Sequence, residues 1–498
     1  MMGRDSALGA RRSALLGLAS LIACTAPAAA QLRPNPLFAD GAVLQRGVPV
    51  PVWGTGARSG ERVAVSLGAQ RVSATAAADG RWTARLAPLA AGGPYALVIA
   101  GERDTVRVRD VMAGEVWVAG GQSNMGLTLE RAAGGDTVLP RSADSLLRVF
   151  LVGRDTADTA LAAVRRGRWA RADSAALRNF SAVAYFFARD LRRAMPGVAV
   201  GVIGSYWGGT GAAPWASRAA LERVPALRGM LLRADSVRVD PSRSPPRAQS
   251  GGPGGAARNP QHPGVLHNAM IAPLQPYAIR GAIWYQGEAN AGRADEYRTL
   301  FPTMIADWRA GWGQGDFPFL FVQLPNYLPD TVETPRARWA QLRAAQLHAS
   351  RVVPNAAMVV TVDQGEPHNL HPTRKDVVGA RLALAARAVA YGERNVEYAG
   401  PRYESMAARG DSVLLAFTHR GGGLRLAPAD SVTGFEVAGA DGVWAPARAA
   451  LRGDRVLVWS PAVRAPKVVR YGWLDNPPVT LTSAEGLPAS PFRTDDGK

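Results

Sequence analysis

Residues 115–125, EVWVAGGQSNM, form the stretch that decides the fold. Their first five residues are a short, mainly apolar run, which is typical of a strand buried on both faces in a parallel sheet. Two glycines, a glutamine and a serine follow at once. Ser123 therefore lies on a glycine-flanked turn at the carboxyl end of a strand, where α/β sheets form their ligand sites. The stretch predicts an α/β domain with a functional site at this edge of its sheet.

Further apolar runs extend this pattern toward the C-terminus. Four of them have the same continuous character: 198–203, 281–285, 319–323 and 358–362. Between them, three segments carry apolar residues at helical spacing: 183–195, 296–312 and 377–391. Strands that alternate with helices indicate a central α/β domain with a parallel sheet.

Both flanks of this domain have a β pattern. Residues 31–110 alternate short β-rich runs with turns, and from residue 394 similar runs return. Short strands at this spacing favour β-sandwich-like modules. We therefore expect an N-terminal module over 31–110, the α/β domain over 111–393 and a C-terminal β-rich module over 394–498. Residues 238–264 are rich in Pro, Gly, Ser and Arg and are expected to form a flexible loop inside the central domain.

The length and charge of the chain limit the classes of protein to which it can belong. A chain of 498 residues is long for one domain and fits two or three. The formal net charge is +18, and all but three of the 58 basic residues are arginines. They are scattered rather than clustered, which argues against a nucleic-acid partner. After residue 30 every apolar stretch is too short or too interrupted for a multi-span membrane protein.

The N-terminus has the pattern of an export signal. Within residues 1–30, arginines precede an apolar run over 13–23, and small residues end at Ala30, after which cleavage is expected. The single cysteine, Cys24, ends the stretch LIAC, which resembles a bacterial lipobox. We therefore expect a periplasmic or extracellular protein, with a lipid anchor on Cys24 as the alternative. A single cysteine leaves no internal disulfide to form.

Three more polar loops follow predicted strands. They are WGGT (207–210), WYQGEAN (284–290) and DQGEPHNLHP (363–372). Because all follow strands, they can meet Ser123 at one sheet edge. The small residues of WGGT allow a close approach of backbone to a ligand. Side-chain amides in WYQGEAN can complete an oxyanion hole, whereas a structural role is favoured for Glu288.

The loop over 363–372 supplies the groups that a serine nucleophile needs. These are a histidine base that takes its proton and a carboxylate that orients the histidine. The same loop also permits a metal site, with Asp363, Glu366, His368 and His371 as ligands. No matching cluster of ligands occurs elsewhere in the sequence, so serine chemistry is favoured.

Several short motifs occur together and in order, and they resemble the sialate O-acetylesterase family of SGNH-type serine esterases. They are GQSNM (121–125), WGGT (207–210), WYQGE (284–288), His371-Pro372 after Leu370, Lys375 and GARLA (379–383), with VLQR (43–46) and GLPASPFRT (486–494) on the flanks. The resemblance covers nearly all of the chain after residue 35.

The resemblance implies an SGNH-like three-layer domain that hydrolyses O-acetyl esters on sugars. Ser123 would be the nucleophile and His371 the general base. The backbone N–H groups of Ser123 and Gly208 would form the oxyanion hole together with the Gln286 side chain, and Asn290 is the alternative donor. The expected intermediate is an acetyl-enzyme, and no metal or organic cofactor is implied.

The acid that orients the histidine is the point where this sequence departs from the family pattern. Many SGNH esterases carry an Asp three residues before the histidine, and that position is His368 here. Asp363 is the preferred acid because it ends the strand, with Glu366 as the alternative. A Ser–His dyad with a backbone carbonyl on the imidazole is also open, as is His368 acting as the base.

The motifs encode ester chemistry and leave the sugar open. An O-acetylated sugar or glycan is the expected partner, and both 9-O-acetylsialate and acetylated plant polysaccharides such as xylan fit. The rival from another class is a glycan-binding protein with an inactive hydrolase domain. The presence of Ser123, His371 and Gln286 argues against that rival.

Overall fold

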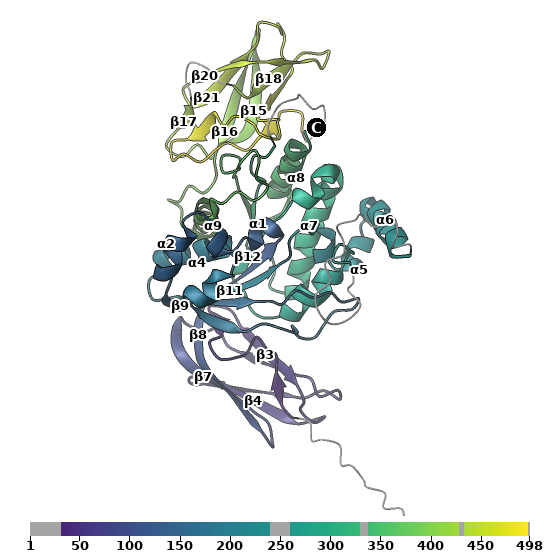
Figure 1. The fold of residues 1–498 in the computed structure, drawn as a ribbon, viewed down its shortest axis with the longest axis vertical. Helices are drawn as coiled ribbons and strands as arrows, with labels where there is room; N and C mark the ends of the chain where they lie inside the picture. The colour runs from purple at the N-terminus through teal and green to yellow at the C-terminus, as the bar shows by residue number, and fades with distance from the viewer. Residues whose placement is uncertain (1–30, 240–258, 329–336, 428–432, 497–498) are drawn as a thin grey trace, which may run out of the picture.

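The computed structural model describes residues 31–239, 259–328, 337–427 and 433–496. The predicted signal, Cys24 and most of the predicted loop over 238–264 lie outside the described residues. Figure 1 shows three parts along the long axis: an N-terminal β-rich part, a central α/β layer and a C-terminal β-rich part. Within the described residues, no helix is both long enough and apolar enough to cross a membrane.

The central sheet has the strand order β10-β9-β11-β8-β12-β13-β14. Its strands are β8 (Thr105–Gly121), β9 (Asp144–Leu151), β10 (Trp169–Ala172), β11 (Ala199–Tyr206), β12 (Gly281–Tyr285), β13 (Phe319–Val322) and β14 (Ala356–Val359). From β9 to β14 every pairing is parallel, whereas β10 pairs antiparallel with β9 at the edge. The sheet predicted as parallel is therefore mixed.

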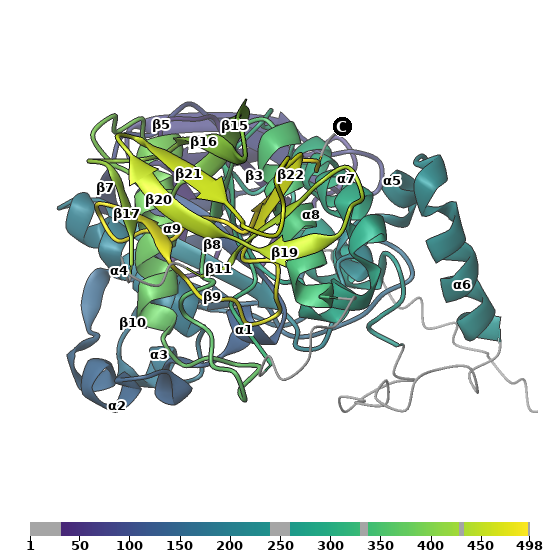
Figure 2. The ribbon, with the colours of Figure 1, turned by 90° about the horizontal axis from the view of Figure 1, so that it is seen from above.

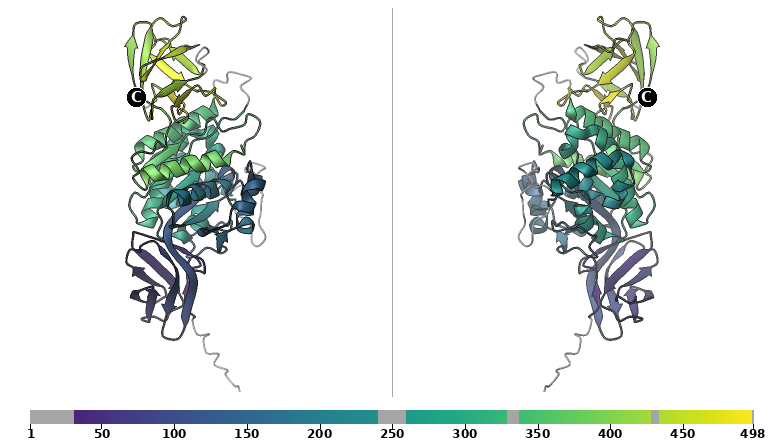
Figure 3. Two further views of the ribbon diagram at one scale, coloured as in Figure 1. Left: turned by 90° about the vertical axis from the view of Figure 1, so that its left-hand side faces the viewer. Right: turned by 90° about the vertical axis from the view of Figure 1, so that its right-hand side faces the viewer.

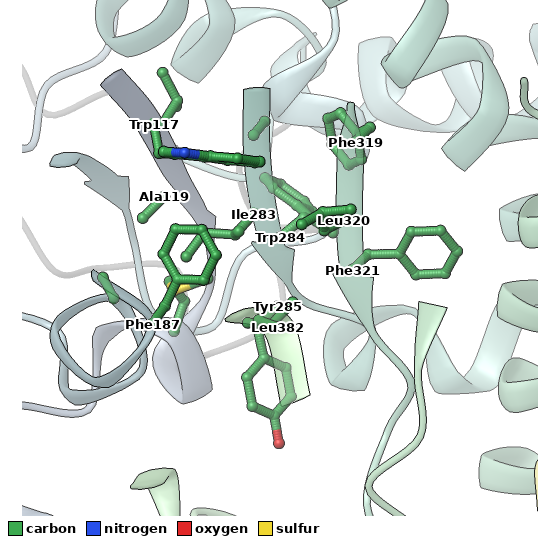
Figure 4. Packing of buried hydrophobic residues seen from close by; sticks show 14 of the residues in the cluster. Trp117, Ala119, Phe187, Ile283, Trp284, Tyr285, Phe319, Leu320, Phe321 and Leu382 are labelled. Atoms are coloured by element: carbon green, nitrogen blue, oxygen red, sulfur yellow. The ribbon is translucent and has the colours of Figure 1, made fainter. Parts of the chain in front are cut away.

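Large aromatic side chains fill the space around the middle strands. Trp117, Trp284 and Phe319 are buried, and Figure 4 shows them with their neighbours. The ring centroids of Trp117 and Phe187 lie 5.1 Å apart. Gly120 gives the Trp284 ring its place, because a Cβ there would lie 2.9 Å from that ring. Continuous apolar strands thus become a core that is buried on both faces.

Helices cover both faces of this sheet and create three layers. The long ones are α4 (Ala182–Ala194), α7 (Ala294–Trp312), α8 (Arg338–Val352) and α9 (Lys375–Val389). Figure 3 shows α4 and α9 side by side on one face, and α7 packs with α8 on the other. The other helices are α1 (Ser123–Gly126), α2 (Gly135–Val138), α3 (Ser174–Arg178), α5 (Arg218–Glu222) and α6 (Arg228–Val239). Figure 2 shows α6 at one side of the molecule.

The N-terminal part is built on an extension of β8. Its strands are β1 (Arg33–Pro34), β2 (Val43–Gln45), β3 (Val50–Thr55), β4 (Arg62–Leu67), β5 (Gln70–Thr75), β6 (Trp82–Leu86) and β7 (Gly92–Ala100). β1, β3 and β6 form a three-stranded sheet, while β7 and β2 pair with the first part of β8. β8 therefore runs from the N-terminal part into the central sheet and crosses residue 110, where the sequence predicts a boundary.

The C-terminal part holds two four-stranded antiparallel sheets, β15-β16-β21-β20 and β19-β18-β22-β24, and a pair, β17-β23. The strands are β15 (Arg402–Arg409), β16 (Ser412–Thr418), β17 (Leu424–Leu426), β18 (Phe435–Ala438), β19 (Trp444–Pro446), β20 (Arg448–Arg452), β21 (Arg455–Trp459), β22 (Val468–Tyr471), β23 (Leu481–Ser483) and β24 (Phe492–Arg493). These additional β-rich sheets agree with the predicted β-rich module.

Candidate active site

Ser123 and His371 meet at the carboxyl edge of the central sheet. Ser123 begins α1 directly after β8, and its Oγ lies 2.8 Å from Nε2 of His371. Gly121 makes the preceding turn possible: its φ is 138°, and a Cβ there would lie 2.2 Å from the carbonyl oxygen of Tyr285. The two residues are 248 positions apart in the chain, and both are partly accessible to solvent.

His371 is in a setting that suits a base. Burial lowers the pKa of its imidazole, and the positive charges of Lys375 and Arg131 lower it further. A lowered pKa favours the neutral imidazole near pH 7, which is the form that accepts a proton. The backbone N–H of His371 donates to Oδ1 of Asn369 at 3.0 Å, so the loop also holds this residue by its main chain.

The two candidate acids have other partners. Oδ1 and Oδ2 of Asp363 each accept a bond of 2.6 Å from the Arg381 guanidinium, at the start of the loop. Glu366 accepts from Thr373 and from Asn369, inside the loop. In the described part of the chain, neither carboxylate has a hydrogen bond to His371. The contact expected between Asp363 and His371 is absent there, and Asp363 faces Arg381 and Gln364 instead.

The amides of Gln286 and Asn290 form an ordered pair. Gln286 is fully buried, and its Nε2 donates to Oδ1 of Asn290 at 2.8 Å and to the carbonyl of Thr210 at 3.3 Å. The backbone N–H of Ala212 donates to the same Oδ1 at 3.0 Å. Both hydrogens of the Gln286 amide are thus engaged. Two donors on one oxygen fix the orientation of the Asn290 amide and leave its Nδ2 as the available donor.

Gly208 brings backbone close to the serine. A Cβ on Gly208 would lie 3.3 Å from the Cβ of Ser123, so this exposed residue lies against the expected nucleophile. Any larger side chain would crowd the space beside Oγ. The arrangement fits the expected role of the backbone of Gly208 in an oxyanion hole.

The remaining loop alternatives are not assembled. His368 is exposed, whereas His371 faces Ser123. Among the described residues, no group of three or more His, Cys, Asp or Glu side chains could hold a metal ion. The four side chains considered as metal ligands therefore have separate surroundings. Asp363 bonds to Arg381, Glu366 to its own loop and His371 to Ser123, and His368 is exposed.

Two polar residues beneath the site were given no role by the sequence. Lys375 is 1% exposed and its Nζ donates to Oδ1 of Asn124 at 2.6 Å. Asn124, which is fully buried, donates from Nδ2 to Glu288, for which a structural role is expected, and to the carbonyl of Leu370. Lys375 is one of only three lysines in a chain rich in arginine, and this was the available signal.

Known proteins of one family resemble this chain. The family model "Carbohydrate esterase, sialic acid-specific acetylesterase" matches residues 256–388. Mouse sialate O-acetylesterase is 32% identical over 409 residues, which are 74% of this chain and 75% of the mouse protein. The human enzyme is 31% identical over 402 residues, with 74% and 72% covered.

A solved structure agrees over almost the whole chain. A carbohydrate acetylesterase from Xanthomonas citri superposes with a TM-score of 0.83 at 40% identity, and the match covers 93% of this chain and 100% of that one. With the curated relatives, this fixes the family and the class of reaction. The chain belongs to the sialate O-acetylesterase family of carbohydrate esterases and is a carboxylic ester hydrolase.

Proposed function

We propose that the protein removes O-acetyl groups from carbohydrates by an SGNH-type mechanism in which Ser123 and His371 form a dyad. The observation that supports the proposal is the distance of 2.8 Å between Oγ of Ser123 and Nε2 of His371. The pKa of His371 is lowered by burial, which suits a base that works near neutral pH.

The reaction proceeds in two halves. Ser123 Oγ attacks the acetyl carbonyl carbon while its proton moves to Nε2 of His371. The tetrahedral intermediate collapses, the bond to the sugar oxygen breaks, and that oxygen takes the proton from the imidazolium. Water then attacks the acetyl-serine and gives one proton to His371, which passes it to Ser123 Oγ as that bond breaks. Acetic acid leaves and ionises to acetate in solution.

The oxyanion is stabilised by three donors. They are the backbone N–H groups of Ser123 and Gly208 and Nδ2 of Asn290, the amide that Gln286 orients from below. This assignment reverses the order expected from the resemblance, because Gln286 spends both amide hydrogens on Thr210 and Asn290.

The experiment is acetate release by the purified mature chain. Substrates are O-acetylated sialic acid, acetylated xylan oligosaccharides and 4-nitrophenyl acetate. Ser123→Ala is expected to abolish release with the fold intact, and Ser145→Ala, a change at an exposed serine in β9, is expected to match the parent. The relative rates of acetate release from O-acetylated sialic acid and from acetylated xylan oligosaccharides show which sugar the enzyme prefers. Unchanged release by Ser123→Ala would refute the mechanism, and sugar binding without release would favour the glycan-binding alternative.

We also propose that the protein acts outside the cytoplasm. The arginine-containing start and the apolar run before Ala30 support export. The test is N-terminal mass analysis after expression in a bacterial host with a periplasm. A chain that begins at residue 31 supports signal cleavage, an acylated Cys24 supports the lipid anchor, and an intact cytoplasmic chain overturns export.

A further inference from the structure

A buried polar network lies directly behind the reacting pair. Asn124 follows Ser123 in the chain, Leu370 precedes His371, Glu288 begins η8 (Glu288–Arg293) after β12, and Lys375 begins α9. Asn124 and Lys375 are 0% and 1% exposed. Four segments that each carry part of the site therefore meet at one point away from solvent.

The Asn124 amide joins these segments. Its Oδ1 accepts from Nζ of Lys375 at 2.6 Å. Its Nδ2 donates to Oε1 of Glu288 at 2.5 Å and to the carbonyl oxygen of Leu370 at 3.0 Å. Both hydrogens of the amide are used, so the side chain has one orientation that satisfies all three partners.

The charges at the two ends of the amide support each other. An ammonium group beyond the reach of water is expensive unless opposite charge lies close by. Burial lowers the pKa of Lys375 to about 7, and the charges of Glu288 and Glu366 oppose that shift. Burial raises the pKa of Glu288, and Lys375 opposes that shift in turn. The ring centroid of Tyr285 lies 5.0 Å from Nζ. A cation on the amide oxygen and a carboxylate on the amide nitrogen both polarise the amide in the same direction, which strengthens its bonds.

Among the described residues, no carboxylate forms a hydrogen bond with His371, so the histidine is held through its loop. Asn124 donates a hydrogen bond to the carbonyl of Leu370, and Oδ1 of Asn369 accepts one from the backbone N–H of His371. We propose that Asn124, fixed between Lys375 and Glu288, is the positioning residue that holds the base against the nucleophile. This inference rests on the proposed reaction of Ser123 and His371.

Lys375→Met in the full chain is the first test. The variant removes the donor to Oδ1 and leaves the Asn124 amide held only by Glu288 and the carbonyl of Leu370. We expect kcat on 4-nitrophenyl acetate to fall about tenfold or more with KM within about threefold. Loss of the positive charge also raises the pKa of His371, so the acid limb of kcat/KM moves to higher pH. Arg131, the other cation acting on His371, stays in place.

The matched control is Lys467→Met, a change at an exposed lysine in the C-terminal part. It is expected to leave kcat and the pH profile unchanged. The shift of the acid limb reports only the lost charge, so kcat is the deciding quantity: a purely structural Lys375 would lower the melting temperature but leave kcat of the folded variant within about threefold of the parent. A folded Lys375→Met variant with kcat within about threefold of the parent overturns the proposal.

Changes at the other two members keep the test decisive if Lys375→Met does not fold. Asn124→Asp keeps the acceptor for Lys375 but loses both N–H donors, so kcat is expected to fall about 10²-fold. Glu288→Gln keeps an acceptor for Asn124 and is expected to retain clearly more activity than Glu288→Ala. Full activity of Asn124→Asp, or equal losses at the two Glu288 variants, would refute positioning through this amide.

A fluorophosphonate probe separates this inference from the proposed substrate. The probe labels an activated serine without recognition of any sugar. A parent that releases no acetate but is labelled at Ser123 would contradict the proposed function alone. Labelling rates of Lys375→Met and Asn124→Asp would then decide the inference: a drop of about tenfold supports it, and parental rates overturn it.

Discussion

At the residue scale, the side-chain amides of Gln286 and Asn290 in the loop over 284–290 have different roles. Asn290→Ala removes the oxyanion donor, and kcat is expected to fall by about 10²–10³ with KM nearly constant. Gln286→Ala only frees the Asn290 amide to turn, so a smaller loss of about tenfold is expected. Steady-state kinetics on an aryl acetate measures both. If Gln286→Ala were the more damaging change, Gln286 itself would be the donor.

Asp363 is the residue for which sequence and structure disagree most. Its side chain is 22% exposed and that of Arg381 9%, so the pair is largely shielded from water. Asp363→Asn loses one acceptor and sets an amide N–H against the guanidinium. Unfolding free energy is expected to drop by about 2 kcal/mol. The kcat of the folded variant should stay within a few-fold of the parent, whereas His371→Ala loses about 10³ or more. A large kcat loss in a stable Asp363→Asn variant would restore the acid role.

The pH dependence follows from the charges around His371. Burial, then Lys375 and Arg131, place the pKa of its imidazole below the ordinary value of 6.5. Protonated histidine cannot accept the serine proton, so kcat/KM falls with decreasing pH, and its acid midpoint is expected below 6.5. Arg131→Gln removes one positive charge and should move this midpoint upward. Arg131 is exposed, so high salt should shrink the shift. A downward movement would contradict the sign.

At the element scale, one glycine sets the distance between two helices. A Cβ on Gly379 of α9 would lie 2.5 Å from Cβ of Phe186 and 2.7 Å from the backbone nitrogen of Phe187 in α4. Gly379→Ala forces α9 away, together with Lys375 at its start. We expect about 1–3 kcal/mol of destabilisation in urea unfolding, and kcat should fall as well.

The control for this change is Gly229→Ala in α6, where only the far end of the Arg233 side chain lies near the new methyl, at 3.4 Å. Alanine in an open helical position should be neutral or stabilising by up to about 1 kcal/mol. Equal effects of the two changes would show that the contact between α4 and α9 does not restrict α9.

Apolar elements could be predicted from the sequence with close bounds. β12 coincides with the predicted run over 281–285, because its pattern is set by the strand's own residues. α8 was not predicted, since Arg343 and Gln346 occupy its buried face and hide the helical period. Both bond to carbonyl oxygens on other segments, Arg343 to Leu324 and Gln346 to Gln286. Such polar burial depends on tertiary partners.

The candidate site also has features that the sequence predicts and features that it does not. The four loops could be predicted because each follows an apolar strand. The pairing of Ser123 with His371 followed from the family resemblance. The bond of Asp363 to Arg381 and the bond of Lys375 to Asn124 span 18 and 251 positions. Nothing local in the sequence distinguishes a carboxylate that faces a histidine from one that faces an arginine.

At the scale of the whole molecule, the C-terminal part touches the loop of the base. Oδ1 of Asn476 accepts from Nδ2 of Asn326 at 2.7 Å, and Oδ1 of Asn326 accepts from the backbone N–H of Gly365 at 2.6 Å. Arg343 adds bonds to the carbonyls of Leu474 and Asp475. Two amides therefore connect the C-terminal part to the beginning of the loop that ends at His371.

Asn476→Ala tests whether this connection reaches the chemistry. One hydrogen bond contributes about 0.5–1.5 kcal/mol, and a free-energy change of about 1.4 kcal/mol is tenfold in rate. If the lost bond loosens the loop, kcat should fall roughly three- to tenfold. KM should stay constant, because Asn476 acts on the loop and not on the sugar. Asn395→Ala, at an exposed asparagine, is the control. A changed KM with constant kcat would place Asn476 at the substrate instead, and an unchanged enzyme would mean that the C-terminal part contributes nothing to the geometry of the base.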